Sequence, residues 1–177
     1  MTELDLEPAG LGPLPGDRRF ATIDSVIVRA PMPVIFALAA DVERWPALLP
    51  HYRYVRVRGQ TRGAAYVEMS ASRPFGSLNW PTWWTSLMAV HRPDGGSPPA
   101  IRFRHVHGIT IGMEVAWTFD DVAGGTLVRI AHVWNGPHWP LIGGMAARAI
   151  IGPVFVHGIA SRTLAGLARE AERIASV

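Results

Sequence analysis

The sequence predicts an α+β fold in which a curved antiparallel sheet wraps around one long C-terminal helix. Strand periodicity dominates the middle of the chain, two short helices follow the first strand, and a helical apolar period fills the C-terminal end. A sheet and a helix that each have one apolar face bury both most simply when the helix lies across the sheet. With 177 residues, of which 49% are hydrophobic, the chain can form one domain with a substantial core.

The N-terminal part predicts one strand followed by two short helices. Residues 20–29 are predicted as the strand, and Pro31 marks its end. An apolar helix follows as far as Leu38. A second short helix begins at Asp41, a residue type that is favoured at helix N-caps, and ends near Pro50.

Residues 1–18 are predicted to be a flexible tail in front of a single domain, residues 19–177. The tail carries Glu3, Asp5 and Glu7, followed by Gly and Pro at close intervals. A signal peptide needs a basic start and a continuous apolar core, and this segment has neither. The sequence is therefore predicted to belong to a cytoplasmic protein, and no second domain or internal repeat is visible.

The middle of the chain predicts antiparallel strands separated by turns. The strands are predicted at residues 54–60, 65–73, 80–91, 100–107, 113–120 and 126–134. Turn signals stand at residues 61–63, 92–96 and 123–125, where Gly recurs. The first and the last of these turns indicate β-hairpins.

The last part of the chain predicts a long helix over about residues 154–175. One face of this helix is apolar and consists of Phe155, Ile159, Leu167, Ala171 and Ile174. Residues 139–160 are long enough to span a bilayer, but Arg148, His157 and two Gly/Pro breaks interrupt them. A helix packed on a cavity is therefore predicted in preference to a membrane span. The role of the Gly/Pro-rich segment 139–153 stays open.

The composition excludes several classes of chemistry. The chain has no cysteine, which excludes disulfides and thiolate metal sites, and no lysine, which excludes Schiff-base catalysis. Its arginines are spread along the chain, so no nucleic-acid partner is predicted. Phosphate loops, dinucleotide fingerprints and His-Glu-x-x-His motifs are absent from the sequence, and no cofactor is predicted.

Three histidines raise the question of a metal site. His105 and His107 share one face of a predicted strand, and His132 on another strand would complete a three-imidazole site. No inward carboxylate is available to orient these rings, and the two strands need not be neighbours. Histidines on apolar faces are more often hydrogen-bonded core or ligand-contact residues, so no metal is predicted.

Strand alternation predicts which side chains face the C-terminal helix. The inward sets are Val67, Met69 and Ala71; Ile101, Phe103, His105 and His107; Met113, Val115, Trp117 and Phe119; and Val128, Ile130, His132 and Trp134. Residues 80–91 are apolar on both faces, so the pattern does not choose between Trp83 and Trp84. The predicted ligand-contact set is Trp45, Met69, Trp84, Phe103, His107, Trp117, Trp134, Phe155 and Ile159.

Arg73 is in phase with the inward residues Met69 and Ala71, at the end of its strand. A guanidinium in an apolar chamber is costly to bury unless it is paired or hydrated. A ligand oxygen could be its partner, because guanidinium donates in a fixed fork. The alternative is that Arg73 turns outward at the rim and pairs with a surface carboxylate. Both interpretations stay open at this point.

Several short motifs stand in the order in which a known family carries them. They are Ala30-Pro31, Asp41-x-x-x-Trp45-Pro46 with Tyr52 after it, Ser72-Arg73-Pro74, Trp84-Thr85-Ser86, Trp117-Thr118-Phe119 and Val122-Ala123-Gly124-Gly125-Thr126. In these motifs the chain resembles the START-like helix-grip (SRPBCC) superfamily, and in particular its branch of polyketide aromatase/cyclases and cyclase/dehydrases. The resemblance covers about residues 20–175 and implies a helix-grip fold around a ligand cavity.

The resemblance also implies roles for single residues. Arg73 matches the family arginine that binds and polarises substrate carbonyls. A cyclase would fold a poly-β-keto chain in the cavity, and Tyr52, His105 or His132 would move protons during aldol closure and dehydration. These four residues form the predicted catalytic set.

Two functions follow as hypotheses. The first is a polyketide aromatase/cyclase, and the second is a non-catalytic carrier of an isoprenoid quinone, lipid or other polycycle. Both require a small hydrophobic ligand as partner, and only the first requires well-placed acid and base groups. Transient membrane contact and a homodimer are included among the partner hypotheses.

Overall fold

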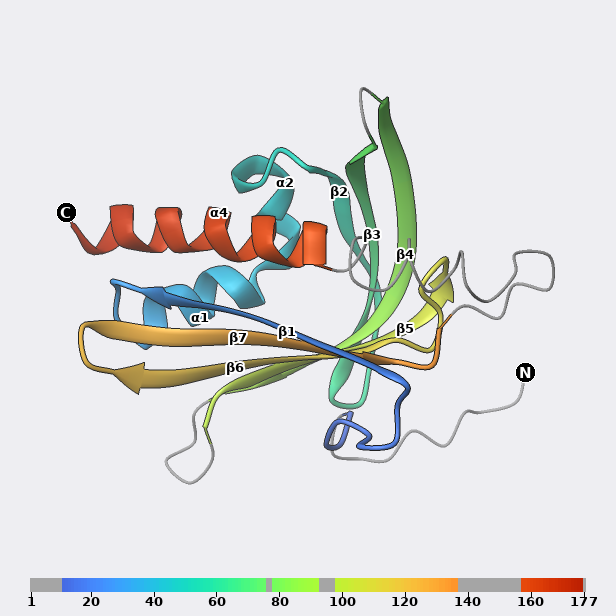
Figure 1. Cartoon of the computed structure of the whole chain (residues 1–177), viewed down its shortest axis with the longest axis horizontal. Coiled ribbons are helices and arrows are strands. Elements are labelled where there is room, and N and C mark those ends of the chain that lie inside the picture. Colours follow the sequence, from blue (N-terminus) through green and yellow to red (C-terminus); the bar gives the residue numbers. More distant parts are fainter. Residues whose placement is uncertain (1–10, 76–77, 93–97, 137–156, 177) are drawn as a thin grey trace.

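A computed structural model of the chain describes residues 11–75, 78–92, 98–136 and 157–176 (Figure 1). Strand β1 (Phe20–Val28) leads into α1 (Met32–Ala40), η1 (Val42–Arg44) and α2 (Trp45–Leu48). Six strands and a long helix follow, namely β2 (Tyr52–Thr61), β3 (Ala64–Phe75), β4 (Leu78–His91), β5 (Ala100–Gly108), β6 (Glu114–Val122), β7 (Gly125–Trp134) and α4 (His157–Ala175).

All seven strands form one antiparallel sheet in the order β1-β7-β6-β5-β4-β3-β2. The first strand therefore pairs with the last, and the remaining neighbours are consecutive in the chain. Figure 1 shows that the sheet curves, with β2, β3 and β4 rising beside α2 and α4 while β1, β6 and β7 run below α4. The predicted α+β helix-grip fold, with two short helices after the first strand, is confirmed.

Two glycines in the turn between β6 and β7 allow this hairpin to form at the residues where the sequence predicts it. Gly124 and Gly125 both have positive φ, at 88° and 151°. A Cβ atom at Gly125 would lie 2.0 Å from the carbonyl oxygen of Val28, so only glycine lets β7 approach the end of β1 this closely. Thr126 then donates a hydrogen bond to the carbonyl of Ala30 over 2.9 Å, which ties the hairpin to the start of α1.

The core lies between the concave face of the sheet and the helices. Leu164, Leu167 and Ala171 of α4 are buried in it, and Phe36 of α1 meets Phe119 of β6 edge-on at a centroid distance of 5.2 Å. These residues form one continuous apolar cluster with the inward side chains of the strands. Burial of the apolar faces of sheet and helix against each other supplies the main driving force for this arrangement.

The opposite face of the sheet carries a second set of contacts. Leu11 is buried against Leu87 and Ala89 of β4, so a residue of the segment 1–18, which the sequence predicts as a flexible tail, packs on the domain.

Glu114 of β6 accepts a hydrogen bond from the buried guanidinium of Arg102 at 3.2 Å. A buried pair of this kind is satisfied only as a unit, because either charge alone would be costly to bury.

Among the helices of the described ranges, none is long and apolar enough to cross a membrane. The Gly/Pro-rich segment 139–153 and most of the candidate span 139–160 lie outside the described residues, as does the first part of the helix predicted at 154–175. The described part of that helix, α4, ends at Ala175, the residue at which the sequence predicts its end.

Truncating the centre of α4 should destabilise the protein strongly. Leu167 is fully buried, so we expect Leu167→Ala to lower the free energy of unfolding by about 2–5 kcal/mol. Ile174→Ala, on the same helix but 40% exposed, should change it by about 0.5 kcal/mol or less. Urea denaturation followed by circular dichroism measures both. Equal effects of the two variants would contradict the position of α4 against the sheet.

Candidate functional site

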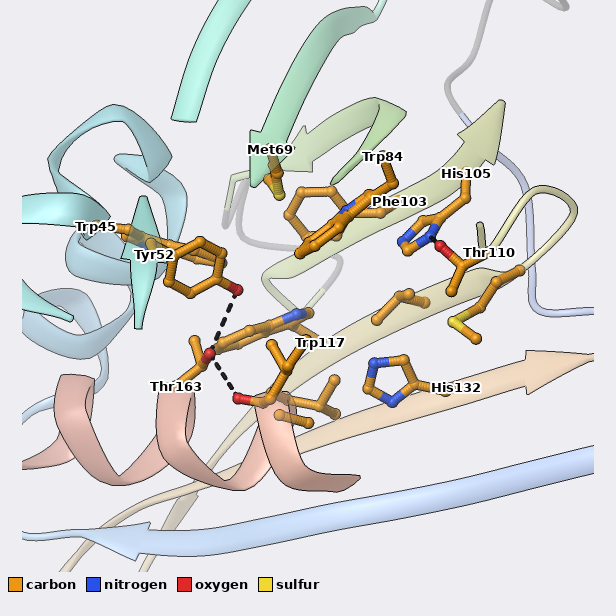
Figure 2. Close-up of a pocket in the computed structure, with 15 residues that line it drawn as sticks. Trp45, Tyr52, Met69, Trp84, Phe103, His105, Thr110, Trp117, His132 and Thr163 are labelled. Atoms are coloured by element: carbon orange, nitrogen blue, oxygen red, sulfur yellow. Dashed lines mark hydrogen bonds between the residues drawn. The ribbon is translucent and has the colours of Figure 1, made fainter. Parts of the chain in front are cut away.

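A pocket opens between the sheet and the N-terminal half of α4 (Figure 2). It contains about 580 Å³ of empty space, part of which is open to solvent. Its lining comes from α2, the six strands β2 to β7, the β5–β6 turn and α4. The lining residues are Trp45, Tyr52, Met69, Trp84, Phe103, His105, Thr110, Met113, Val115, Trp117, Ile130, His132, Ile159, Ala160 and Thr163.

Aromatic rings form much of the wall of this pocket. Trp45 contacts Tyr52 edge-on at 5.2 Å between centroids and lies 5.8 Å from Trp117. Trp84 is 6.4 Å from Tyr52 on the other side. Strand register brings Trp84 next to another lining residue, Met69. The two are direct partners in the β3–β4 ladder and point to the same face. Flat rings in such an array suit a planar apolar ligand.

One end of the pocket is polar through His105, Thr110 and His132, which Figure 2 shows on the side away from Tyr52. The His105 ring stacks on Trp84 at 5.9 Å with an interplanar angle of 14°, and its Nδ1 lies 2.6 Å from Oγ1 of Thr110. His132 enters from β7, beside Val115 in the β6–β7 ladder.

Burial decides the charge of the two histidines. Burial, together with the neighbouring His132, lowers the pKa of His105 to about 3. Burial also lowers the pKa of His132 to about 3. Both rings are therefore neutral at neutral pH, so each has one nitrogen that donates and one that accepts a hydrogen bond. This end of the pocket can thus bind a hydroxyl or a carbonyl oxygen.

The tight β5–β6 turn places Thr110 next to His105. The amide of Gly112 donates to the carbonyl of His105 at 2.9 Å, and the amide of His105 donates to the carbonyl of Met113 at 2.8 Å. Nε1 of Trp134 donates to the carbonyl of Ile111 at 3.0 Å and fixes the turn from the side. Trp134 thus has a supporting role, since it holds the turn and does not line the pocket.

The other polar end consists of Tyr52 on β2 and Thr163 on α4. Their hydroxyl oxygens lie 3.3 Å apart, and Thr163 also donates to the carbonyl of Ile159 at 2.8 Å (Figure 2). Burial raises the pKa of Tyr52 well above its ordinary value, so its phenol stays protonated. Tyr52 is therefore a hydrogen-bond donor for a ligand oxygen at this end.

The described lining contains no Asp, Glu or Arg. Its polar groups are neutral and sit at two separated ends of an aromatic chamber (Figure 2). Within the described ranges, no group of three His, Asp or Glu side chains is arranged to hold a metal ion. The chemistry available from these residues is hydrogen bonding and proton transfer at ligand oxygens in an environment of low polarity.

The structure brings most of the predicted site residues together. Lining the pocket are Trp45, Tyr52, Met69, Trp84, Phe103, His105, Trp117, His132 and Ile159. It also decides between the two adjacent tryptophans, because Trp84 is 6% exposed and lines the pocket whereas Trp83 is 52% exposed. Phe155 and the side chain of Arg73 lie outside the described part of the chain, although the backbone of Arg73 pairs with Trp80 in the β3–β4 ladder.

The predicted inward direction of His107 needs correction. In the β4–β5 ladder Ser86 pairs with His105, but the next residue back, Thr85, pairs with His107. One residue of β5, Val106, is therefore bulged out of register, and a bulge reverses the alternation of side chains beyond it. His107 is consequently exposed and does not line the pocket. Trp134 does not line this pocket either, and its ligand contact stays a prediction.

Six lining residues are absent from the predicted contact set. Met113, Val115 and Ile130 belong to the inward strand sets, so alternation indicated them. Ala160 faces the pocket from α4. Thr110 and Thr163 carry hydroxyls at the two polar ends and had no signal in the sequence, because one position depends on the turn and the other on how α4 docks.

Comparison with known proteins identifies the family. The model of the family "Polyketide cyclase / dehydrase and lipid transport" matches residues 28–155, which is more than half of the chain. The protein therefore belongs to this family, and the resemblance seen in the sequence is confirmed.

Solved structures share the fold at low sequence identity. TTHA0849 from Thermus thermophilus is 19% identical, with a TM-score of 0.71 over 89% of this chain and 99% of that one. The Zhui aromatase/cyclase from Streptomyces sp. R1128 is 19% identical, with a TM-score of 0.67 over 86% and 93%. A START superfamily protein from Mycobacterium smegmatis is 16% identical, with a TM-score of 0.55 over 88% and 97%. At these identities the similarity establishes the fold.

The neutral His105 makes the stability depend on pH. In the unfolded chain a histidine binds a proton below its ordinary pKa of 6.5, whereas folded His105 does so only near pH 3. Between these values the unfolded state holds more protons, so the free energy of unfolding should fall as the pH falls, by at most about 1.4 kcal/mol per pH unit for this group. His105→Gln should reduce that slope in urea titrations between pH 7 and pH 4.

The exposed His91, at the end of β4, gives the matched control His91→Gln. A pH dependence of unfolding that is the same in the wild type and in His105→Gln would contradict the burial of a neutral ring at this position.

Proposed function

We propose that the protein binds a planar, polycyclic or polyketide-like ligand in this pocket and promotes its aldol cyclisation and dehydration. The observation that supports the proposal most directly is the aromatic chamber with hydrogen-bonding groups at two separated ends. Such a chamber holds a flat carbon skeleton by its faces and its oxygen atoms by the ends.

In the proposed reaction the ends of the pocket have different tasks. Tyr52, which is protonated, donates a hydrogen bond to a ligand carbonyl oxygen and stabilises the negative charge that develops there in the enolate. His105 or His132, which are neutral, accept a proton from the carbon that attacks and return it to the hydroxyl that leaves as water. The chamber contributes by holding the chain folded, so that the two reacting carbons meet.

Filling part of the chamber should weaken ligand binding. Ala160 lines the pocket, whereas Ala165 on the same helix is exposed. We expect saturable quenching of tryptophan fluorescence by dihydroxyanthraquinone in the wild type and in the control Ala165→Leu. Ala160→Leu should weaken this binding by about tenfold or more, or about 1.4 kcal/mol, because the added atoms occupy ligand space. Unsaturable quenching in the wild type would refute the ligand-binding proposal.

Arg73 provides the test of the catalytic part. If its guanidinium holds a ligand carbonyl, Arg73→Ala should cost about 1.5–3 kcal/mol in binding or turnover, with stability nearly unchanged. Arg73→Lys should restore only part of this loss, because an ammonium lacks the planar fork. If Arg73 instead forms a surface ion pair, affinity should stay unaltered and stability should change by about 0–1 kcal/mol.

A suitable substrate probe is 1-(2-naphthyl)hexane-1,5-dione, which closes to a naphthyl cyclohexenone with loss of one water. The conjugated product is followed by its absorbance, and affinity is measured separately by fluorescence. Turnover that is lost in Arg73→Ala supports the cyclase. Saturable binding without turnover in the wild type favours the alternative, a non-catalytic carrier of a lipid or isoprenoid quinone. The described part of the pocket lining has no Asp, Glu or Arg, which would also suit such a ligand.

A further inference from the structure

Tyr52 is the first member of a row of hydrogen-bonding groups that leads away from the pocket. Its hydroxyl oxygen lies 3.3 Å from Oγ1 of Thr163, and Oγ1 lies 3.1 Å from Nε2 of His51. Tyr52 and Thr163 both line the pocket, and Thr163 is only 1% exposed. His51 does not line the pocket, and it is partly exposed in the turn between α2 and β2.

Aromatic rings pack beside this row. Trp45 contacts the Tyr52 ring from one side, and the His51 ring lies 4.7 Å from it on another. Burying polar groups costs free energy unless they are hydrogen-bonded. An unbroken row of hydrogen-bonding groups from the pocket to the surface therefore calls for a functional explanation. A hydrogen bond from Thr163 to Ile159 alone would satisfy a buried threonine on a helix.

We propose that Tyr52, Thr163 and His51 form a proton relay between a ligand oxygen in the pocket and the solvent. The proposal rests on the ligand binding proposed above and extends it with the connection from Tyr52 through Thr163 to His51. Tyr52 exchanges a proton with the ligand oxygen, Thr163 links Tyr52 to His51 from the pocket wall, and His51 is a relay residue that does not line the pocket.

The transfer balances in both directions. Inward, Tyr52 gives its phenolic proton to a ligand oxyanion, Thr163 gives its proton to Tyr52, and His51 gives its Nε2 proton to Thr163. Nδ1 of His51 then takes one proton from water, which leaves as hydroxide, so the ring changes from the Nε2–H to the Nδ1–H tautomer. Outward, the same steps run in reverse and release one proton to water. No charge remains on the relay after either passage.

The protonation states of the end groups agree with this task. Burial, together with the nearby Arg162, lowers the pKa of His51 to about 4, so its ring is neutral at neutral pH and can exchange tautomers. The phenol of Tyr52 stays protonated because burial raises its pKa. The hydroxyl of Thr163 carries one proton and two lone pairs, so it can accept from one neighbour and donate to the other after a rotation about its C–O bond.

The test uses 2-naphthol, a planar hydroxyaromatic whose excited state is a far stronger acid than its ground state. With protein in excess, the bound probe should emit as naphtholate, because the relay removes its proton. Thr163→Val, which keeps the shape of the side chain and removes the hydroxyl, should lose most of that emission. His51→Gln should lose it too, since an amide can hydrogen-bond to Thr163 but cannot pass a proton on.

Matched controls separate the relay from general effects of substitution. Thr118→Val and His91→Gln change the same residue types at exposed positions and should keep the naphtholate emission of the wild type. His51→Gln also covers the case in which Thr163→Val fails to fold, because His51 is only partly buried. Affinity for 2-naphthol, from the binding isotherm, should stay close to the wild-type value in His51→Gln.

The outcomes distinguish the relay from the proposed function. Saturable binding of 2-naphthol with naphtholate emission that is unchanged in His51→Gln would overturn the relay and leave ligand binding standing. Binding with emission from neutral naphthol alone in the wild type would do the same. Absence of saturable binding would contradict the proposed function, and the relay with it.

Discussion

The packing of α4 against the concave face of the sheet is the constraint on which the rest of the structure depends. Leu164, Leu167 and Ala171 anchor the helix in the core. Gly166 lets it pack closely on Leu49, the residue after α2, since a Cβ atom there would lie 2.2 Å from Cδ2 of Leu49. The preceding turns of the helix carry Ala160 and Thr163, which line the pocket. One helix therefore closes the core along one part of its length and bounds a pocket along another.

The pocket tolerates its polar groups because none of those described carries a charge. Burial keeps His105 and His132 neutral and Tyr52 protonated, which avoids the large cost of ions in an apolar chamber. Neutral groups of this kind bind oxygen atoms and exchange protons without attracting water as strongly as ions would. The same property serves the proposed cyclisation and the proposed relay, because both move a proton without leaving a buried charge.

The fold could be predicted from the sequence because its signals are local. Alternation of apolar residues identified the strands, and Gly124 and Gly125 marked the last hairpin. The prediction failed where pairing departs from regularity. The bulge at Val106 reverses the direction of His107, and nothing in the alternation of β5 announces it, since the residue before and the residue after would fit a regular strand equally well.

Local sequence patterns were enough to predict the order of the elements and the family. They also predicted the inward residues Met69, Phe103, Trp117 and His132, because side-chain alternation is a property of each strand alone. The folded structure was needed to show that Trp84 and not Trp83 lines the pocket and that Thr110 meets His105. It alone joined Thr163 to Tyr52 and His51. These contacts link residues on different elements, and their geometry depends on how the helix and the turn dock, which no local pattern encodes.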